Sequence, residues 1–422
     1  MAAEVSTKQR LLNTIGPGIL MAGAAVGVSH LVQATRAGAD YGFALWWLLL
    51  LAIITKYPFM EFGPRYAAAT GNHLIQGYRK LGKPYLFTYG FITVGTMIII
   101  QAAVTIATAG LAEHFFGFGW SPFFWSAIIL GICITVLFIG KYKALDFSMR
   151  IIISVLTICT FTAVIFALFG DVAVGAARPE PPSYWHAAGL AFIIAFMGWM
   201  PIPLDASVWH SIWSLEKARH KKYRPSLSDA RLDFNIGYLA AGFIGLLFFI
   251  LGALVMFGSE RSFPTGSVGF AAELVAIYGE TLGSWSIPVV AIAAFITMFS
   301  TTLAVTDAYP RVMMEFRGAY NVKILGESQQ WQTYVITLFA VPSLALGILF
   351  FFSEQFTLLV DFAAGLSFLS APILAWFNYR LITGEDIQPE ARPGKAYAWF
   401  STICLLFLIS FSFVYLYWRL FV

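Results

Sequence analysis

Apolar runs long enough to cross a lipid bilayer recur along the whole chain, and they limit the possible folds more than any other feature. A helix needs about 20 mostly apolar residues to cross about 30 Å of hydrocarbon. Only 11% of the 422 residues are charged, whereas a soluble domain carries about 25%. We therefore expect an all-α integral membrane protein with about 11 transmembrane helices. We place these spans at residues 13–35, 43–63, 84–112, 120–140, 147–172, 185–214, 232–257, 285–310, 331–352, 356–381 and 396–420.

Lysine and arginine in the short connections predict the orientation of the chain, because positive charge is enriched in cytoplasmic loops. The basic clusters are Lys8/Arg10, Arg79/Lys80/Lys83, Lys141/Lys143, Lys217 to Arg231, and Arg311/Arg317/Lys323. All of them fall on one side if the chain has eleven spans. We expect a multi-pass protein of the plasma membrane with a cytoplasmic N-terminus and an outside C-terminus. The net charge of +4 then reflects the topology of the chain. We expect membrane lipid and a small solute or ion as partners, and no nucleic acid.

Covalent catalysis and metal-cluster chemistry are not indicated by the sequence. The cysteines Cys133, Cys159 and Cys404 lie in apolar runs without a CxxC spacing, which predicts neither disulfides nor a zinc site. The loops hold no recognisable nucleophile, phosphate loop or metal-ligand cluster. We therefore expect a transporter without a cofactor, and not an enzyme.

Two predicted spans contain residues that interrupt a helix. The first carries Gly23, Gly27 and Ser29 near its midpoint, and the sixth contains "WMPIPLDAS" with Pro201 and Pro203 two residues apart. Non-helical backbone at membrane depth is tolerated only where protein or a water-filled cavity satisfies it. Paired interrupted helices are typical of the central site of transporters built from inverted repeats. We expect the breaks, near residues 23–30 and 200–207, to face each other close to mid-membrane.

The stretch "GPGILMAGAAVGVSHLVQATRAGADYGF" resembles the first helix of the Nramp divalent-metal transporters. After GPG come eight residues, a four-residue motif, six residues and AGxxYG, in the spacing of that family. Further matches are "PRYAAATG", the "MP" and "HS" of the sixth span, and "STTLAVTDAYPRVMMEF". The resemblance implies a LeuT-type fold in one transporter domain, residues 1–422. Its two five-helix repeats would cover about 13–172 and 185–381, with an extra helix at about 396–420.

The four-residue motif departs from the family pattern. Nramp metal transporters carry Asp-Pro-Gly-Asn there, whereas this chain has Gly27-Val28-Ser29-His30 and so lacks both oxygen ligands. In the sixth span, counting back from His210 places Pro203 at the family's Met position and Asp205 at its His position. Counting forward from Met200 gives a different alignment. We prefer the alignment counted from His210 for the half of the sixth span beyond the break.

These departures predict a remodelled central site. Free N–H groups at the start of the outer half-helix would favour a carboxylate, and Asp205 would neutralise an amine or a coupling cation. An ionisable residue inside the membrane is expected to be functional and to have a partner of opposite charge. We expect a small solute other than Mn²⁺ or Fe²⁺. The predicted substrate-binding residues are Gly27, Val28, Ser29, His30, Met200, Pro203 and Asp205.

A divalent metal transporter is the alternative, with a weaker or partly hydrated ion held by His30, Asp205 and Met200. His30 could also serve only to hydrogen-bond loose backbone at the break. Asp307 and Arg311 lie four residues apart and are expected to form a structural ion pair.

The coupling ion is left open between H⁺ and Na⁺. In transporters of the LeuT type, sodium can lie between carbonyls of the first helix and hydroxyls of the eighth, which Ser300, Thr301 and Thr302 would supply here. His210 is the one part of the family's proton route that aligns.

Overall fold

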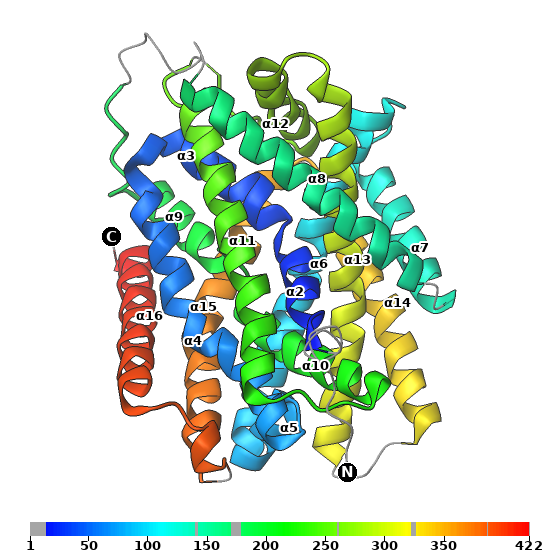
Figure 1. Cartoon of the computed structure of the whole chain (residues 1–422). Coiled ribbons are helices and arrows are strands. Elements are labelled where there is room, and N and C mark those ends of the chain that lie inside the picture. The colour runs from blue at the N-terminus through cyan, green and yellow to red at the C-terminus, as the bar shows by residue number, and fades with distance from the viewer. Residues whose placement is uncertain are drawn as a thin grey trace, which may run out of the picture.

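The computed structural model describes residues 14–139, 142–169, 179–259, 261–321, 326–385 and 387–421. These residues form a bundle of helices (Figure 1). Eight helical segments within them are long and apolar enough to cross a membrane, and one of these, Pro17–Thr70, contains two predicted spans. Two shorter apolar helices cover Ser154–Phe169 and Ala187–Trp199. The expected helical membrane fold is therefore confirmed.

All eleven predicted spans correspond to helices, two of them divided. The first span consists of α2 Pro17–Ala25, the π-helix η1 Val28–Ala34 and α3 Thr35–Tyr41, and the short 3₁₀ helix η2 Gly42–Leu45 follows. The sixth consists of α9 Ala187–Trp199 and α10 Ala206–Lys221. The undivided spans are α4 Trp46–Thr70, α6 Lys83–Phe116, α7 Pro122–Ile139, α8 Tyr142–Phe169, α11 Leu227–Val255, α13 Ser286–Asn321, α14 Glu327–Phe352, α15 Phe356–Thr383 and α16 Lys395–Phe421.

Two helices were not expected, α5 Leu74–Leu81 and α12 Ser267–Leu282. Both are shorter than the roughly 20 residues of a membrane span, so a search for long apolar runs passes over them. The start of α5 is fixed by a capping box in which the side chain of His73 and that of Gln76 each accept from the other's backbone N–H. Figure 1 places α5 and α12 at opposite ends of the bundle.

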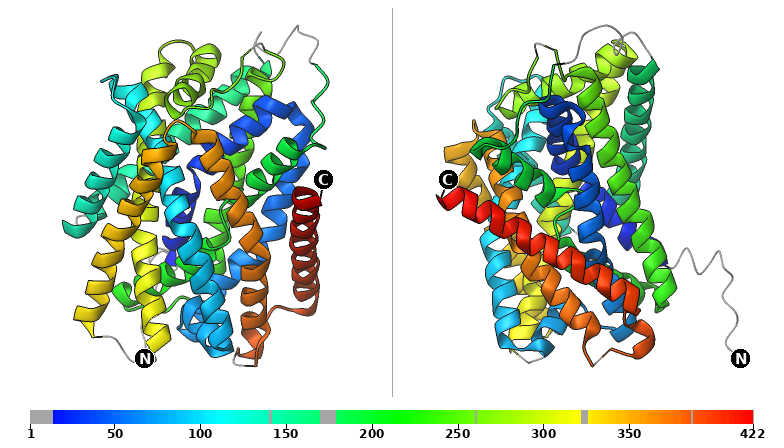
Figure 2. Two further views of the ribbon diagram at one scale, coloured as in Figure 1. Left: turned by 180° about the vertical axis from the view of Figure 1, so that it is seen from behind. Right: turned by 90° about the vertical axis from the view of Figure 1, so that its left-hand side faces the viewer.

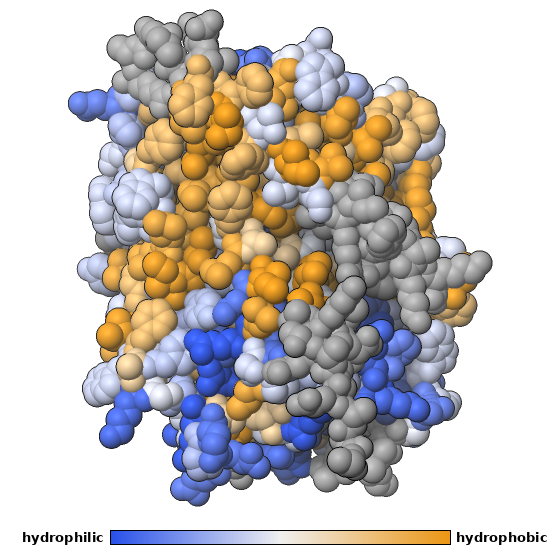
Figure 3. Space-filling model, viewed as in Figure 1, coloured by the Kyte–Doolittle hydropathy of each residue, from blue (hydrophilic) through white to orange (hydrophobic). Residues whose placement is uncertain are grey.

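Hydrophilic residues gather at the end of the bundle where α2 starts. Figure 3 shows them below a broad apolar band on the face it presents, and Figure 1 places α5 and α10 at that end. Of the predicted basic clusters, Lys8, Arg10, Lys141, the side chain of Lys143, and Lys323 lie outside the described residues. Figure 2 shows α16 slanting across the outside of the bundle, where it contacts α15, α4 and α9.

The start of the first span is fixed to α11. The carboxylate of Asp233 accepts hydrogen bonds from the backbone N–H groups of Gly16 and Gly18, each at 2.7 Å. These N–H groups have no partner within the helix, and a charged acceptor satisfies them strongly. A Cβ atom on Gly237 would lie 2.0 Å from the carbonyl oxygen of Gly18, so only glycine permits this close packing of α2 on α11.

The C-terminal half of the first span forms polar contacts with α15. Arg36 forms an ion pair with Asp361 at 2.8 Å, and the amide of Gln33 donates to the same carboxylate at 2.8 Å. In α13 the expected pair of Asp307 and Arg311 is confirmed at 2.6 Å. Polar side chains thus join the two halves of the first span to different helices, while both halves also pack on α11.

Candidate functional site

Both interrupted helices break where the sequence predicts. α2 ends at Ala25, Val26 and Gly27 leave the helical conformation, and η1 starts at Val28. In the sixth span, helical structure stops at Trp199 and resumes at Ala206. Residues from both breaks line one cavity, so the breaks face each other as expected.

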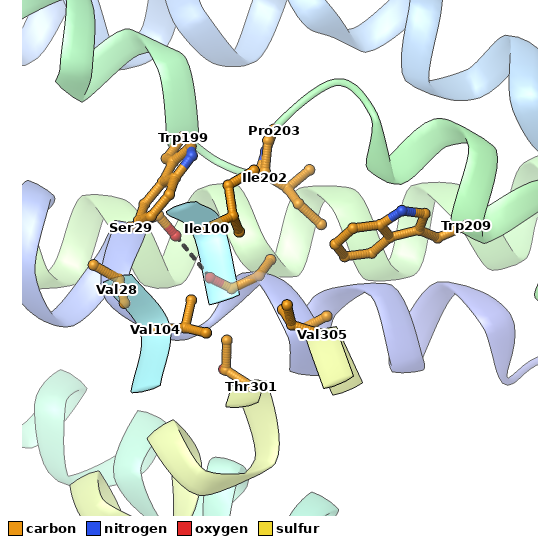
Figure 4. A pocket seen from close by; sticks show the side chains of 12 residues that line it. Val28, Ser29, Ile100, Val104, Trp199, Ile202, Pro203, Trp209, Thr301 and Val305 are labelled. Carbon is orange, nitrogen blue, oxygen red and sulfur yellow. Dashed lines mark hydrogen bonds between the residues drawn. The ribbon is translucent and has the colours of Figure 1, made fainter. Parts of the chain in front are cut away.

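The cavity between the breaks measures about 30 Å³, room for one or two water molecules. α6 and α13 complete its wall (Figure 4). The hydroxyls in this wall belong to Ser29 and Thr301, and the other side chains are aliphatic, proline or tryptophan. The lining residues are Ala24, Ala25, Val28, Ser29, Ile100, Val104, Trp199, Ile202, Pro203, Trp209, Thr301 and Val305.

Of the seven predicted substrate-binding residues, Val28, Ser29 and Pro203 line the cavity. Gly27 lies at the break itself, but its N–H is not free as expected, because it donates to the carbonyl of Ala25 at 2.8 Å. Val28 and Ser29 start a helix and so have no preceding turn to accept from their N–H groups. Of the three N–H groups expected to be free at the first break, those of Val28 and Ser29 therefore remain.

His30 and Met200 lie behind the cavity wall. Nε2 of His30 is 2.8 Å from the carbonyl of Ala241, and Nδ1 is 2.7 Å from the hydroxyl of Ser29. Both ring nitrogens are thus occupied inside the protein. A Cβ atom on Gly245 of α11 would lie 2.8 Å from Sδ of Met200 and 3.5 Å from Cδ2 of His30, so the two side chains meet at this glycine.

Asp205 is half-buried at the start of α10. Its Oδ1 is buried and has no hydrogen-bond partner among the described residues. Asp205 lies within electrostatic range of Lys56, but no ion pair or hydrogen bond joins the two side chains among the described residues. The cationic partner expected for Asp205 stays a prediction.

Lys56 was missed in the sequence, although it is one of two charged residues, with Glu61, inside the predicted span 43–63. That position alone marks a residue as a functional candidate. Its ammonium donates to the carbonyls of Gly198, Met200 and Ile202 at 2.7, 3.0 and 3.3 Å. Lys56 thus joins α4 to the break in the sixth span.

Among the coupling candidates, Thr301 lies at the first break. Its hydroxyl is 3.3 Å from the carbonyl of Val26 and 3.4 Å from that of Gly23. Ser300 is buried but does not line the cavity. Thr302 is turned away, since its hydroxyl pairs with that of Thr108 at 2.7 Å.

His210 of α10 is buried next to the start of the first span, away from the cavity wall. Its Nε2 is 3.4 Å from the carboxylate of Asp233, which also caps α2. Asp233 was also missed, because it lies at the predicted edge of a span and reads as an interfacial residue. Within the described ranges, no group of three or more His, Cys, Asp or Glu side chains could hold a metal ion.

Comparison with known proteins identifies relatives over nearly the full length. The family model described as natural resistance-associated macrophage protein-like (Nramp) matches residues 18–418. An uncharacterized protein of Pasteurella multocida is 35% identical over 416 residues, which cover 98% of this chain and 94% of that protein. The divalent metal cation transporter MntH of Staphylococcus aureus is 25% identical over 326 residues, covering 74% of this chain and 71% of that protein.

Solved structures share the fold at low sequence identity. A mutant of the Eremococcus coleocola manganese transporter matches with a TM-score of 0.74 and 13% identity, over 98% of this chain and 87% of that one. MhsT in complex with L-phenylalanine matches with a TM-score of 0.60 and 16% identity, over 94% and 98% of the two chains. The predicted LeuT-type fold is confirmed.

The close approach of the first break to α13 yields a prediction. A Cβ atom on Gly27 would lie 2.5 Å from Oγ1 and 2.8 Å from Cγ2 of Thr301. Gly27→Ala should therefore lower the free energy of unfolding by about 1–3 kcal/mol, the usual cost of overpacking. Adding Thr301→Ala should recover part of that loss. Thermal unfolding of the purified protein in detergent measures both effects.

The matched control is Gly347→Ala in α14, where an added Cβ would meet nothing within 4 Å. It should leave the melting temperature unchanged or raise it, since alanine is the better helix former. A Gly27→Ala protein as stable as the unmodified one would show that the first break does not pack tightly on Thr301.

Proposed function

Because this chain belongs to the natural resistance-associated macrophage protein-like (Nramp) family of membrane transporters, we propose that it is a secondary-active carrier for a small solute other than Mn²⁺ or Fe²⁺. The wall of the cavity between the two breaks carries this proposal. Its side chains offer the hydroxyls of Ser29 and Thr301 and otherwise apolar surface. A divalent transition metal that has lost its water needs imidazole, thiolate or carboxylate ligands, which this wall lacks.

The charged groups around the breaks suit an organic solute with both an acidic and a basic group. The N–H groups of Val28 and Ser29 begin η1, which continues directly into α3, and the positive end of such a helix favours a carboxylate. On the opposite break, Oδ1 of Asp205 has unused capacity to accept from an amine. A zwitterionic solute would satisfy both ends in a conformation with a wider cavity that reaches Asp205, since the cavity described here holds one or two water molecules.

A divalent metal transporter is the second candidate. The observation that favours it is the meeting of His30 and Met200 beside Gly245, because imidazole and thioether are metal ligands. Both side chains would have to turn into the cavity, and His30 would have to give up its bonds to Ser29 and Ala241. Relatives such as the Staphylococcus aureus MntH are named as divalent metal cation transporters.

We further propose that the carrier lies in the plasma membrane with its N-terminal end in the cytoplasm and its C-terminus outside. The described basic residues at the ends of α5 and α10 support this orientation, since cytoplasmic loops are rich in Lys and Arg. They are Arg79, Lys80, Arg219, Lys221 and Lys222.

The first test of the proposal is metal binding. Purified protein titrated calorimetrically with Mn²⁺ should show no binding in the micromolar range, because the cavity wall lacks charged ligands. The Staphylococcus aureus MntH, purified in the same way, serves as the comparison. Saturable Mn²⁺ uptake into liposomes at micromolar concentrations, lost on His30→Ala, would establish the metal transporter instead.

A second test concerns coupling, which we propose to involve the hydroxyls of α13. If sodium drives uptake, Ser300→Ala or Thr301→Ala should weaken the stimulation by sodium and leave any proton dependence unchanged. Thr135→Ala on the exposed face of α7, whose hydroxyl bonds only within its own turn, is the matched control. Uptake by the unmodified protein that ignores sodium would remove this site from the mechanism.

The third test concerns Asp205. A thermal-shift screen against amino acids, small carboxylates and metals first identifies a ligand. Asp205→Asn keeps the shape of the side chain and removes its charge, so the protein should elute normally in gel filtration. Ligand affinity should fall at least about tenfold, equivalent to about 1.4 kcal/mol. The control is Glu385→Gln at an exposed position. Unchanged affinity in the Asp205→Asn protein would exclude Asp205 from the site.

A further inference from the structure

The ammonium of Lys56 is enclosed by backbone oxygen atoms. Lys56 is fully buried in α4, and its Nζ lies 2.7 Å from the carbonyl oxygen of Gly198, 3.0 Å from that of Met200 and 3.3 Å from that of Ile202. An ammonium has three donors and no acceptor. The three carbonyls therefore use its whole hydrogen-bonding capacity.

These carbonyls are available because the sixth span is broken. The last carbonyls of a helix have no partner within it, and they form the negative end of the helix dipole. Gly198 lies in the last turn of α9, and Met200 and Ile202 lie in the break beyond it. Converging backbone carbonyls of this kind replace the hydration shell of a monovalent cation in other membrane proteins.

We propose that the break after α9 is a monovalent-cation site that this chain fills with its own side chain, Lys56. The ammonium supplies, at these three carbonyls, the positive charge that a dissolved cation would otherwise bring. Because the cation is attached to α4, the site is occupied at any concentration of salt. This inference goes beyond the proposed transport activity and does not depend on which solute is carried.

A competing explanation is that Lys56 matters only through the packing of its apolar stem. Two variants separate the explanations. Lys56→Ala removes the three outer carbons and the ammonium, which leaves space for n-propylammonium. Lys56→Met keeps an apolar stem in place and removes only the charge and the donors. Neither variant needs a transported solute for its test. The outcome is therefore independent of the tests of the proposed function.

Thermal unfolding in detergent provides the measurement. The melting temperatures of both variants should fall by at least about 4 °C. n-Propylammonium chloride should raise that of Lys56→Ala in a saturable manner, and NH₄⁺ or K⁺ should do so more weakly. 1-Propanol, which has no charge, and tetramethylammonium, which has no N–H donor, should not. The unmodified protein, Lys56→Met and the exposed control Lys80→Ala should not respond to n-propylammonium.

Stabilisation of Lys56→Ala by 1-propanol and n-propylammonium alike would overturn the cation site and leave only packing. A Lys56→Met protein as stable as the unmodified one would do the same. If Lys56→Ala can be purified only in n-propylammonium, its aggregation on removal of that cation supports the site. Failure to recover it even then, together with an unchanged melting temperature of Lys56→Met, counts against the site.

Discussion

Backbone carbonyl and N–H groups that have lost their helical partners inside an apolar bundle are the constraint on which this structure depends. Lipid cannot satisfy such groups at membrane depth, so protein groups or a water-filled cavity must do so. Lys56 donates hydrogen bonds to three carbonyls in the last turn of α9 and in the break beyond it. Asp233 accepts from two N–H groups at the start of α2. Each acts from a neighbouring helix, so satisfying these helix ends also joins α4 and α11 to them.

Several charges inside the bundle have partners. Arg36 pairs with Asp361, and Arg311 pairs with both Asp307 and Glu216. An unpaired buried charge is strongly unfavourable, whereas a partner and hydrogen bonds make its burial tolerable. The cavity wall itself is left nearly free of charge. Electrostatic influence on a bound solute must therefore come from groups set behind or beside that wall.

The positions of the breaks could be predicted because glycine and proline act locally on the backbone. Whether a side chain faces the cavity depends on the rotation of its helix, which the sequence does not state. His30 and Met200 were therefore expected at the site and instead meet at Gly245 behind it. Lys56 could have been found as a charge inside a predicted span, but its role depends on carbonyls more than 140 residues away, as in its bond to Gly198.

The interrupted first span has one further consequence. Its N-terminal half is joined to α11 through Asp233 and its C-terminal half to α15 through Arg36, and the chain between these contacts leaves the helix at Val26 and Gly27. A continuous helix would transmit any displacement from one of these contacts to the other. Here Val26 and Gly27 interrupt that path, so a displacement passed between the two halves must travel through α11, on which both halves pack.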